Sequence, residues 1–210
     1  NREAALTEEQ IAAHFSSIDN YSKRIEQTPG KADLHFGRAM DYMLVQDFAE
    51  AVRDLDRTIE LAPDYALAYF ARAVVRYKQL QSTHSRQDEL SAPATQETLP
   101  ADESRLRDHE LIIRDYDAVI RLAPNFAFAY FNRGNLRSAG RDFRAAIADY
   151  DEAIRRDPEL AEAYFNRGLA ALSLGDATHG IADLSKAGEL GLPGAYSIIR
   201  RMTEEGKNSE

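Results

Sequence analysis

Apolar residues recur at helical spacing along most of this chain. Phe143, Ile147, Tyr150 and Ile154 place one apolar side chain per turn on a single helical face. Gly140 interrupts the pattern just before this segment. Helical segments separated by such a glycine predict two antiparallel helices joined by a tight turn. A helix pair of this kind cannot bury its apolar faces without a neighbour.

Four prolines show that this hairpin pattern repeats with a fixed period. Pro29 and Pro63 are 34 residues apart, and so are Pro124 and Pro158. Pro63 and Pro124 are 61 residues apart, which is one period of 34 plus an insertion of 27. Periods of this length are typical of stacked helix pairs, in which each pair covers the apolar face of the next.

Certain positions carry the same kind of residue in every unit when each proline is taken as position 32. The four units then begin at Ala32, Ala66, Ala127 and Ala161. Position 8 is always Ala or Gly, which lets the two helices approach closely. Position 16 is always aspartate, just before the second helix, where a carboxylate can accept the unpaired backbone N–H groups of a helix start. We therefore predict helix N-caps at Asp47, Asp108, Asp142 and Asp176.

This set of positions resembles the tetratricopeptide repeat (TPR) family. The resemblance rests on small residues at positions 8, 20 and 27, on Leu or Tyr at position 24, on the unit-ending proline and on an aromatic residue at position 4. The position 4 residues are Tyr69, Tyr130 and Tyr164, with His35 departing from the pattern. The resemblance implies an all-α fold, a superhelical solenoid of antiparallel helix pairs with capping helices at both ends.

The resemblance also implies a division of the chain. Residues 31–192 are expected to hold four TPR units, and residues 1–30 an N-terminal capping helix that starts near His14. Residues 193–210 are expected to form a C-terminal capping helix and a polar tail, with Ile198, Ile199 and Met202 facing inward.

The insertion occupies about residues 81–107, between the two helices of the second unit. It is polar, holds Pro93 and Pro100 and has few apolar residues, so it cannot form a core of its own. We expect a flexible loop or lid. Two roles stay open for it, a tolerated surface excursion and a flap that regulates or binds.

Bulk composition narrows the classes of partner. The chain has 210 residues, a net charge of −9 and no cysteine. Acidity argues against nucleic acid as the partner, because phosphate binding needs a basic surface. Apolar runs are too short to insert in a membrane. We expect a soluble monomer, cytoplasmic by default. The bacterial periplasm is the alternative, because the chain begins with Asn1 rather than Met and its natural N-terminus is expected to be missing.

Arginine at position 7 and aspartate at position 23 also recur in all four units. The arginines are Arg38, Arg72, Arg133 and Arg167, and the aspartates are Asp54, Asp115, Asp149 and Asp183. The two positions lie level across an antiparallel helix pair, so we expect a structural ladder of ion pairs. General acid–base chemistry on these carboxylates is the alternative interpretation.

The histidines lack metal-site spacing, and no nucleophile or phosphate-binding motif occurs, so we expect no enzyme, no cofactor and no metal.

In the TPR arrangement, the first helix of each unit lines the concave face. Phenylalanine stands at position 5 of every unit, and amides follow nearby in the third and fourth units. The candidate peptide-binding residues are Phe36, Phe70, Phe128, Phe131, Asn132, Asn135, Phe165, Asn166 and Arg200. Two interpretations of the rings stay open: an apolar groove for an extended or helical peptide, and packing into the neighbouring unit.

One branch of the TPR family grips the C-terminal carboxylate of heat-shock chaperones, and this chain matches its clamp only in part. Asn135, Asn166 and Arg200 match three clamp positions. Both clamp lysines are missing, and Phe131 and Tyr196 stand in their places. The match does not support that ligand, but it leaves amide and guanidinium groups able to hold a peptide backbone.

The function expected from these observations is a non-catalytic protein–protein interaction module, or scaffold, that binds a peptide or protein on its concave surface. An assembly or structural segment of a longer protein is the alternative. A substrate-recruiting segment of an enzyme whose catalytic part lies elsewhere is another.

Overall fold

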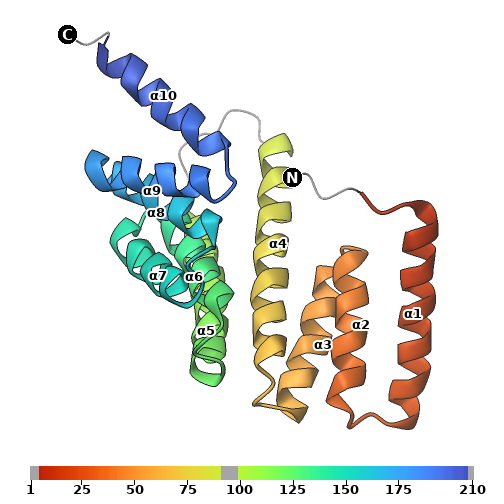
Figure 1. Ribbon diagram of the computed structural model, residues 1–210. Coiled ribbons are helices and arrows are strands. Elements are labelled where there is room, and N and C mark those ends of the chain that lie inside the picture. Colours follow the sequence, from red (N-terminus) through yellow and green to blue (C-terminus); the bar gives the residue numbers. More distant parts are fainter. Residues whose placement is uncertain (1–4, 91–98, 208–210) are drawn as a thin grey trace. The chain divides into compact units, whose positions relative to one another are not determined.

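The computed structural model describes residues 5–90 and 99–207, and this part of the chain is helical without strands (Figure 1). Its helices are α1 (Glu8–Gln27), α2 (Ala32–Leu44), α3 (Phe48–Leu61), α4 (Ala66–Leu90), α5 (Leu99–Leu122), α6 (Ala127–Ala139), α7 (Phe143–Arg156), α8 (Ala161–Ser173), α9 (Ala177–Glu189) and α10 (Gly194–Lys207). The predicted all-α fold class is confirmed.

The chain forms two compact units, each a stack of helices. Unit 1 is Asn1–Leu122 and unit 2 is Ala123–Glu210. In unit 1 each helix from α1 to α5 packs against the next, and in unit 2 the same holds from α6 to α10. We call α2, α4, α6 and α8 the A helices, and α3, α5, α7 and α9 the B helices. Each repeat is one A helix and the B helix that follows it.

The turn between the helices has the same geometry in three repeats. Position 15 is Gln46, Arg141 or Gly175, and its φ is 63°, 63° and 84° respectively. The backbone N–H of the following aspartate donates to the carbonyl of position 11, as from Asp142 to Arg137 at 2.9 Å. This left-handed residue with a six-to-one bond closes the A helix.

Aspartate then starts the B helix. The side chains of Asp47, Asp142 and Asp176 each accept a backbone N–H from three residues further on, which confirms these three N-cap predictions.

The second repeat departs from this pattern, and two predictions about it are wrong. Helix α4 runs on to Leu90 and α5 already begins at Leu99, so residues 81–90 and 99–107 are helical rather than loop. Asp108 therefore lies inside α5 and cannot cap its start. The remaining insertion residues, 91–98, lie outside the described part, so the flexible loop expected there remains a prediction.

The physical reason for the helical extension is visible in the residue types. The insertion contains no glycine, and Gln81–Leu90 holds no proline either, so nothing stops α4. Pro100 falls in the first turn of α5, where its missing N–H has no helical partner to lose. A polar composition favours a loop only when the segment must pack by itself, and a helix pair that prolongs a packed hairpin needs little apolar surface of its own.

Both stacks close with additional helices. Helix α1 begins at Glu8, before the predicted start at His14, with a capping box between Thr7 and Gln10. At the other end, Ile198 and Ile199 on α10 pack against a buried cluster of Leu184, Ala187 and Ala195, although Ile198 and Ile199 are only half-buried.

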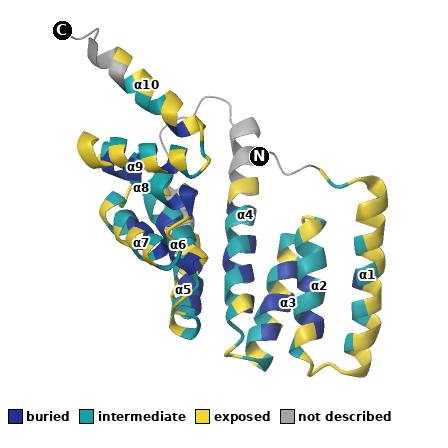
Figure 2. Ribbon diagram, viewed as in Figure 1, coloured by how far each residue is buried: buried dark blue, intermediate teal, exposed yellow. Residues whose placement is uncertain are grey.

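The cores lie between neighbouring A and B helices (Figure 2). In unit 1 the buried cluster is Ala39, Ala51, Leu55, Ala68, Ala71 and Val75. In unit 2 the approach at position 8 is closer still, because a Cβ on Gly134 would lie 2.8 Å from Tyr150 Cε1. Such close helix approach stabilises each pair through many dispersion contacts.

Candidate functional site

The predicted ladder of Arg–Asp ion pairs is present in all four repeats. Arg38 Nε lies 2.7 Å from Asp54 Oδ2, and Arg167 Nη2 lies 2.7 Å from Asp183 Oδ1. The pairs Arg72–Asp115 and Arg133–Asp149 each span 2.6 Å. Three of the carboxylates, those of Asp54, Asp115 and Asp149, are buried, and Asp183 is half-buried.

The ladder also joins consecutive repeats, a feature absent from the predictions above. Arg72 Nη1 lies 2.7 Å from Asp56 on the preceding B helix, and Arg167 Nη1 lies 2.6 Å from Asp151 in the same way. Arg38 reaches back to Ser22 Oγ on α1 at 3.0 Å. Each partner stands at position 25 of the unit before. Aspartate at position 25 in three successive units was the signal available in the sequence.

A second arginine reinforces the ladder in the middle of the chain. Arg76 Nη1 and Arg137 Nη1 lie 2.8 Å from Asp115 and Asp149 respectively. Asp115 and Asp149, each 2% exposed, are thus held by two guanidinium groups. Both carboxylates are buried between packed helices with two arginine partners each, so the geometry favours a structural role for the ladder.

Position 4 ties three of the A helices, α2, α4 and α6, to the end of the unit before. Tyr69 OH donates to the Pro63 carbonyl at 3.0 Å, and Tyr130 OH donates to the Pro124 carbonyl at 3.2 Å. His35 departs from the aromatic pattern but makes the same contact, with its Nε2 2.9 Å from the Pro29 carbonyl oxygen. An imidazole N–H therefore replaces the phenol at this joint.

The four phenylalanines of position 5 are half-buried and take part in the repeat cores. The Phe36 ring lies 5.0 Å from Tyr65, and the Phe131 ring lies 6.1 Å from Tyr150. Phe70 meets Tyr116 edge-on at 6.0 Å, and Phe165 packs on the cluster around Leu184. Phe128 is different, because 44% of it remains exposed. Its ring lies 6.0 Å from that of Phe126.

The structure brings two of the predicted amides together. Asn166 Nδ2 on α8 donates to Asn135 Oδ1 on α6 at 2.8 Å. Tyr150 OH on α7 donates to the same oxygen at 2.9 Å. Asn132 is half-buried on α6, one turn before Asn135, and Arg200 is an exposed residue of α10. This chain of hydrogen bonds joins two neighbouring A helices through Asn135.

The family model of the tetratricopeptide repeat matches residues 36–84 and 131–189, which together are just over half of the chain. The chain belongs to the TPR family. Among curated proteins no relative matches this TPR protein.

Solved TPR structures resemble the chain in fold. A MamA protein is similar over 85% of this chain and 83% of its own, with a TM-score of 0.67 and 18% identity. MamA from Desulfovibrio magneticus RS-1, starting at its residue 41, is similar over 84% and 85% of the two chains, with a TM-score of 0.67 and 16% identity. TTC0263, a thermophilic TPR protein of Thermus thermophilus, is similar over 92% and 91%, with a TM-score of 0.60 and 13% identity. These likenesses show the TPR solenoid fold.

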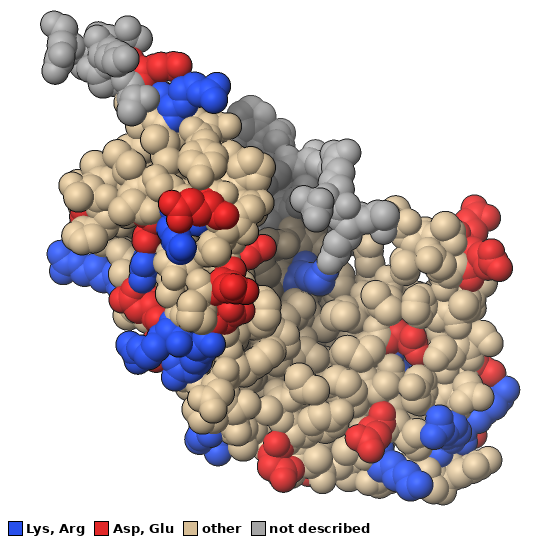
Figure 3. Space-filling model, viewed as in Figure 1, with Lys and Arg blue, Asp and Glu red and all other residues tan. Residues whose placement is uncertain are grey.

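Two further observations concern the charge distribution and the apolar character of the helices. Acidic and basic side chains are interspersed on the face shown in Figure 3 rather than gathered into a basic stripe. Within residues 5–90 and 99–207, no helix has both the length and the apolar character required to cross a bilayer.

Proposed function

We propose that this TPR protein is a non-catalytic interaction module that holds an extended peptide segment of a partner protein on the A helices of unit 2. TPR repeats generally serve as interaction modules, so a protein or peptide partner follows from the family. The finer assignment, to α6 and α8, rests on the hydrogen bonds that join Asn135 and Asn166.

Those hydrogen bonds orient both amides and leave part of each available. Asn135 Oδ1 already accepts two hydrogen bonds, from Asn166 and Tyr150. Neither the Asn135 Nδ2 group nor the Asn166 Oδ1 atom has a partner among the described residues. One donor and one acceptor are therefore held at fixed spacing on adjacent helices. An extended peptide presents alternating carbonyl and N–H groups that suit such a pair.

Apolar surface near the same helices would supply the rest of the binding energy. Phe128 lies on α6 with 44% of its surface exposed, a suitable contact for an apolar side chain of the partner. Asn132 adds a third amide on the same helix. Arg200, Phe131 and Phe165 remain candidate contacts through the parts of their side chains that the core leaves uncovered. In unit 1, Phe36 and Phe70 are the equivalent candidates.

The net charge of −9 favours a neutral or basic protein partner over nucleic acid. The alternatives are a structural segment of a larger assembly and a substrate-recruiting segment of a longer enzyme. We keep the peptide-binding module first because the paired amides provide main-chain recognition that a purely structural stack does not need.

Selection from a phage-displayed library of random peptides on the immobilised full chain would test the proposal. Selected peptides should bind with modest affinity in isothermal titration calorimetry. Asn135→Ala should weaken that binding by about 1–2 kcal/mol, because a hydrogen-bond donor to the peptide backbone is lost. Arg144→Ala, an exposed change on α7, is the matched control and should leave the affinity unchanged.

A second variant separates peptide binding from folding. Asn135→Ala also deprives Tyr150 of its acceptor, whereas Asn132 has no hydrogen bond among the described residues, so Asn132→Ala should weaken binding without lowering thermal stability. If selected peptides bind both variants as tightly as they bind the parent, the A-helix site is wrong. If no peptide is selected, a structural role gains support instead.

A further inference from the structure

Two pockets occupy equivalent places in the two units, and neither is lined by Asn135 or Asn166. The first, in unit 1, has a volume of about 240 Å³ and lies among α3, α4 and α5. The second, in unit 2, has a volume of about 330 Å³ and lies among α7, α8 and α9. In both, two successive B helices form the walls and the A helix between them forms the floor.

The repeat numbering shows that positions 11, 16, 19 and 21 line both pockets. Position 21 is Val52 in the first and Ile147 in the second, and position 16 is Asp108 in the first and Asp176 in the second. Position 11 is Arg76 or Ala171, and position 19 is Leu111 or His179. The two pockets can therefore be compared directly: their shared lining positions are equivalent in the repeat, and only the side chains at those positions differ.

The aspartate at position 16 has different tasks in the two pockets. Asp176 caps α9: it accepts the His179 backbone N–H at 3.1 Å, and His179 Nδ1 lies 2.7 Å from its other oxygen. Asp108 caps nothing, because α5 starts at Leu99 and has already passed through two turns. No hydrogen bond or ion pair reaches the Asp108 carboxylate from any residue that the structure describes. The helical insertion has thus released a carboxylate at the edge of the first pocket.

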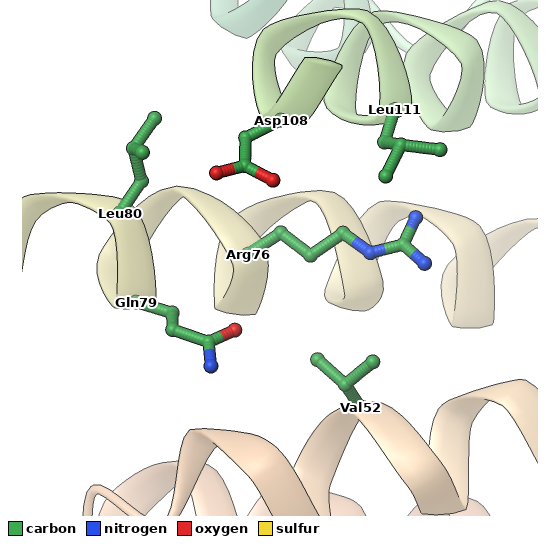
Figure 4. Close-up of a pocket in the computed structure, with 6 residues that line it drawn as sticks. All are labelled: Val52, Arg76, Gln79, Leu80, Asp108 and Leu111. Carbon is green, nitrogen blue, oxygen red and sulfur yellow. The ribbon is translucent and has the colours of Figure 1, made fainter. Parts of the chain in front are cut away.

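The two ladder arginines beside the first pocket are bound to carboxylates other than that of Asp108. Arg76 lines the pocket, but its Nη1 lies 2.8 Å from Asp115 and its Nη2 lies 3.9 Å from Asp56. Arg72 is bound to Asp115 and Asp56 as well. Both guanidinium groups are therefore engaged by Asp56 and Asp115, and neither pairs with the Asp108 carboxylate. Figure 4 shows the Arg76 side chain extending away from Asp108 toward Leu111.

Apolar side chains complete the pocket. Val52 on α3 and Leu80 on α4 are half-buried and buried, and Leu111 on α5 is 40% exposed. They surround a space next to the Asp108 carboxylate (Figure 4). A lysine or arginine side chain has the matching form, since its aliphatic stem packs on apolar surface while its cationic head needs a carboxylate.

We propose that the pocket formed by Val52, Arg76, Gln79, Leu80, Asp108 and Leu111 binds a basic side chain of a partner protein, with Asp108 holding the cationic head. The pocket uses B helices of unit 1, whereas the amide pair uses A helices of unit 2, so this inference does not rest on the proposed peptide site. The net charge of the chain, −9, favours a basic segment over long range as well.

Titration of the ¹⁵N-labelled full chain with N-acetyl-lysine-N-methylamide, followed by NMR, tests this pocket. Amide shifts should gather in Arg76–Leu80 and Asp108–Leu111. N-acetyl-norleucine-N-methylamide has a similar stem without the charge and should bind at least several-fold more weakly. The arginine analogue should bind at the same place, whereas the glutamate analogue should not.

Asp108→Asn should weaken binding of the lysine probe by about five- to tenfold, because a charge-assisted hydrogen bond is lost. Asp176→Asn, the matched change in unit 2, should leave it unaltered. Asp108 is exposed and has no hydrogen-bond or ion-pair partner among the described residues, so the variant should keep its helical circular dichroism and melting temperature.

Three results would overturn the proposal: equal affinity of Asp108→Asn and the parent, equal binding of the norleucine and lysine probes, or shifts that map to the unit 2 pocket. Stronger binding of the glutamate probe would likewise count against it.

Discussion

The second and third repeats share one ion-pair arrangement but join their two helices differently. In the second repeat Asp115 is held by Arg72 and Arg76, and in the third Asp149 is held by Arg133 and Arg137, with the same shortest distances. Yet α6 and α7 meet through a left-handed turn, whereas α4 and α5 continue as helices beyond that point.

The difference teaches that the packed part of a repeat does not depend on the length of its connection. Arginine and aspartate meet across the helix pair whether the chain between them is short or carries 27 extra residues. The role of a residue near the turn does depend on the length of the connection. At position 15, Arg141 is a turn residue, whereas Leu80 is a buried helical residue. At position 16, Asp142 caps a helix and Asp108 does not.

Substituting glycine at position 15 should give the largest difference in stability between the two repeats. Leu80→Gly should lower the free energy of unfolding by roughly 3–5 kcal/mol, because it removes a buried side chain and puts glycine inside a helix. Arg141→Gly should raise it by about 1 kcal/mol, since glycine adopts the positive φ without strain. Urea unfolding followed by circular dichroism measures both. Two changes of the same sign would show that the connections are alike.

Next in size is the shared ion pair. Asp149→Ala and Asp115→Ala should each lower the free energy of unfolding by about 3 kcal/mol, because two arginines lose a buried partner. Asp151→Ala is the control: its side chain is 47% exposed and pairs only with Arg167 among the described residues, so about 0.5 kcal/mol is expected. If Asp149→Ala melts like Asp151→Ala, the ladder is surface charge without structural weight.

A smaller contrast concerns the aspartate at position 16. Asp142→Ala should lower stability by about 1 kcal/mol, because the backbone N–H of Ala145 loses its acceptor. Asp108→Ala should change it by less than about 0.5 kcal/mol, as expected for an exposed helical residue that has no partner among the described residues. Equal losses in thermal unfolding would mean that α5 also begins near Asp108, contrary to the structure.

The smallest effect is a pH dependence of the cap in unit 2. The backbone N–H of His179, helped by its imidazole, lowers the pKa of the Asp176 carboxyl. A lowered pKa stabilises the fold above the ordinary aspartate value of about 4, and this contribution is lost as the pH falls through the folded value. NMR titration of the carboxyl should show the shift, and His179→Ala should reduce it. An unshifted titration in the parent would contradict the hydrogen bond.

Prediction from the sequence succeeded best where a position repeats. The ladder, three of the four caps and the all-α solenoid follow from residues that recur at fixed spacing, because each recurrence reports the same packing environment. Prediction failed at residues 81–90 and 99–107, where no repeat exists for comparison and polarity is the only guide to loop or helix. A polar sequence indicates only that a segment is exposed to solvent. Because a helix pair that extends beyond the core can be as exposed as a loop, polarity does not distinguish the two.

The candidate site divides in the same way. Asn135, Asn166 and Phe131 could be placed on A helices by their positions in the unit. That Asn135 accepts hydrogen bonds from both Asn166 and Tyr150 could not be predicted, since it depends on side-chain rotamers across three helices. His35 departs from the aromatic pattern in the sequence, but its ring nitrogen reaches the Pro29 carbonyl as a tyrosine hydroxyl would.

The sequence by itself determined the period, the helix pairs and the ion pairs of this protein, because helical periodicity, caps and prolines act over a few residues at a time. Only the tertiary structure decided which of the aspartates at position 16 cap a helix. Asp108 and Asp176 are the same residue at the same repeat position, and nothing local distinguishes them. Because α5 starts nine residues earlier, the Asp108 carboxylate has no partner among the described residues and lies beside a pocket, whereas the Asp176 carboxylate caps the helix that it begins.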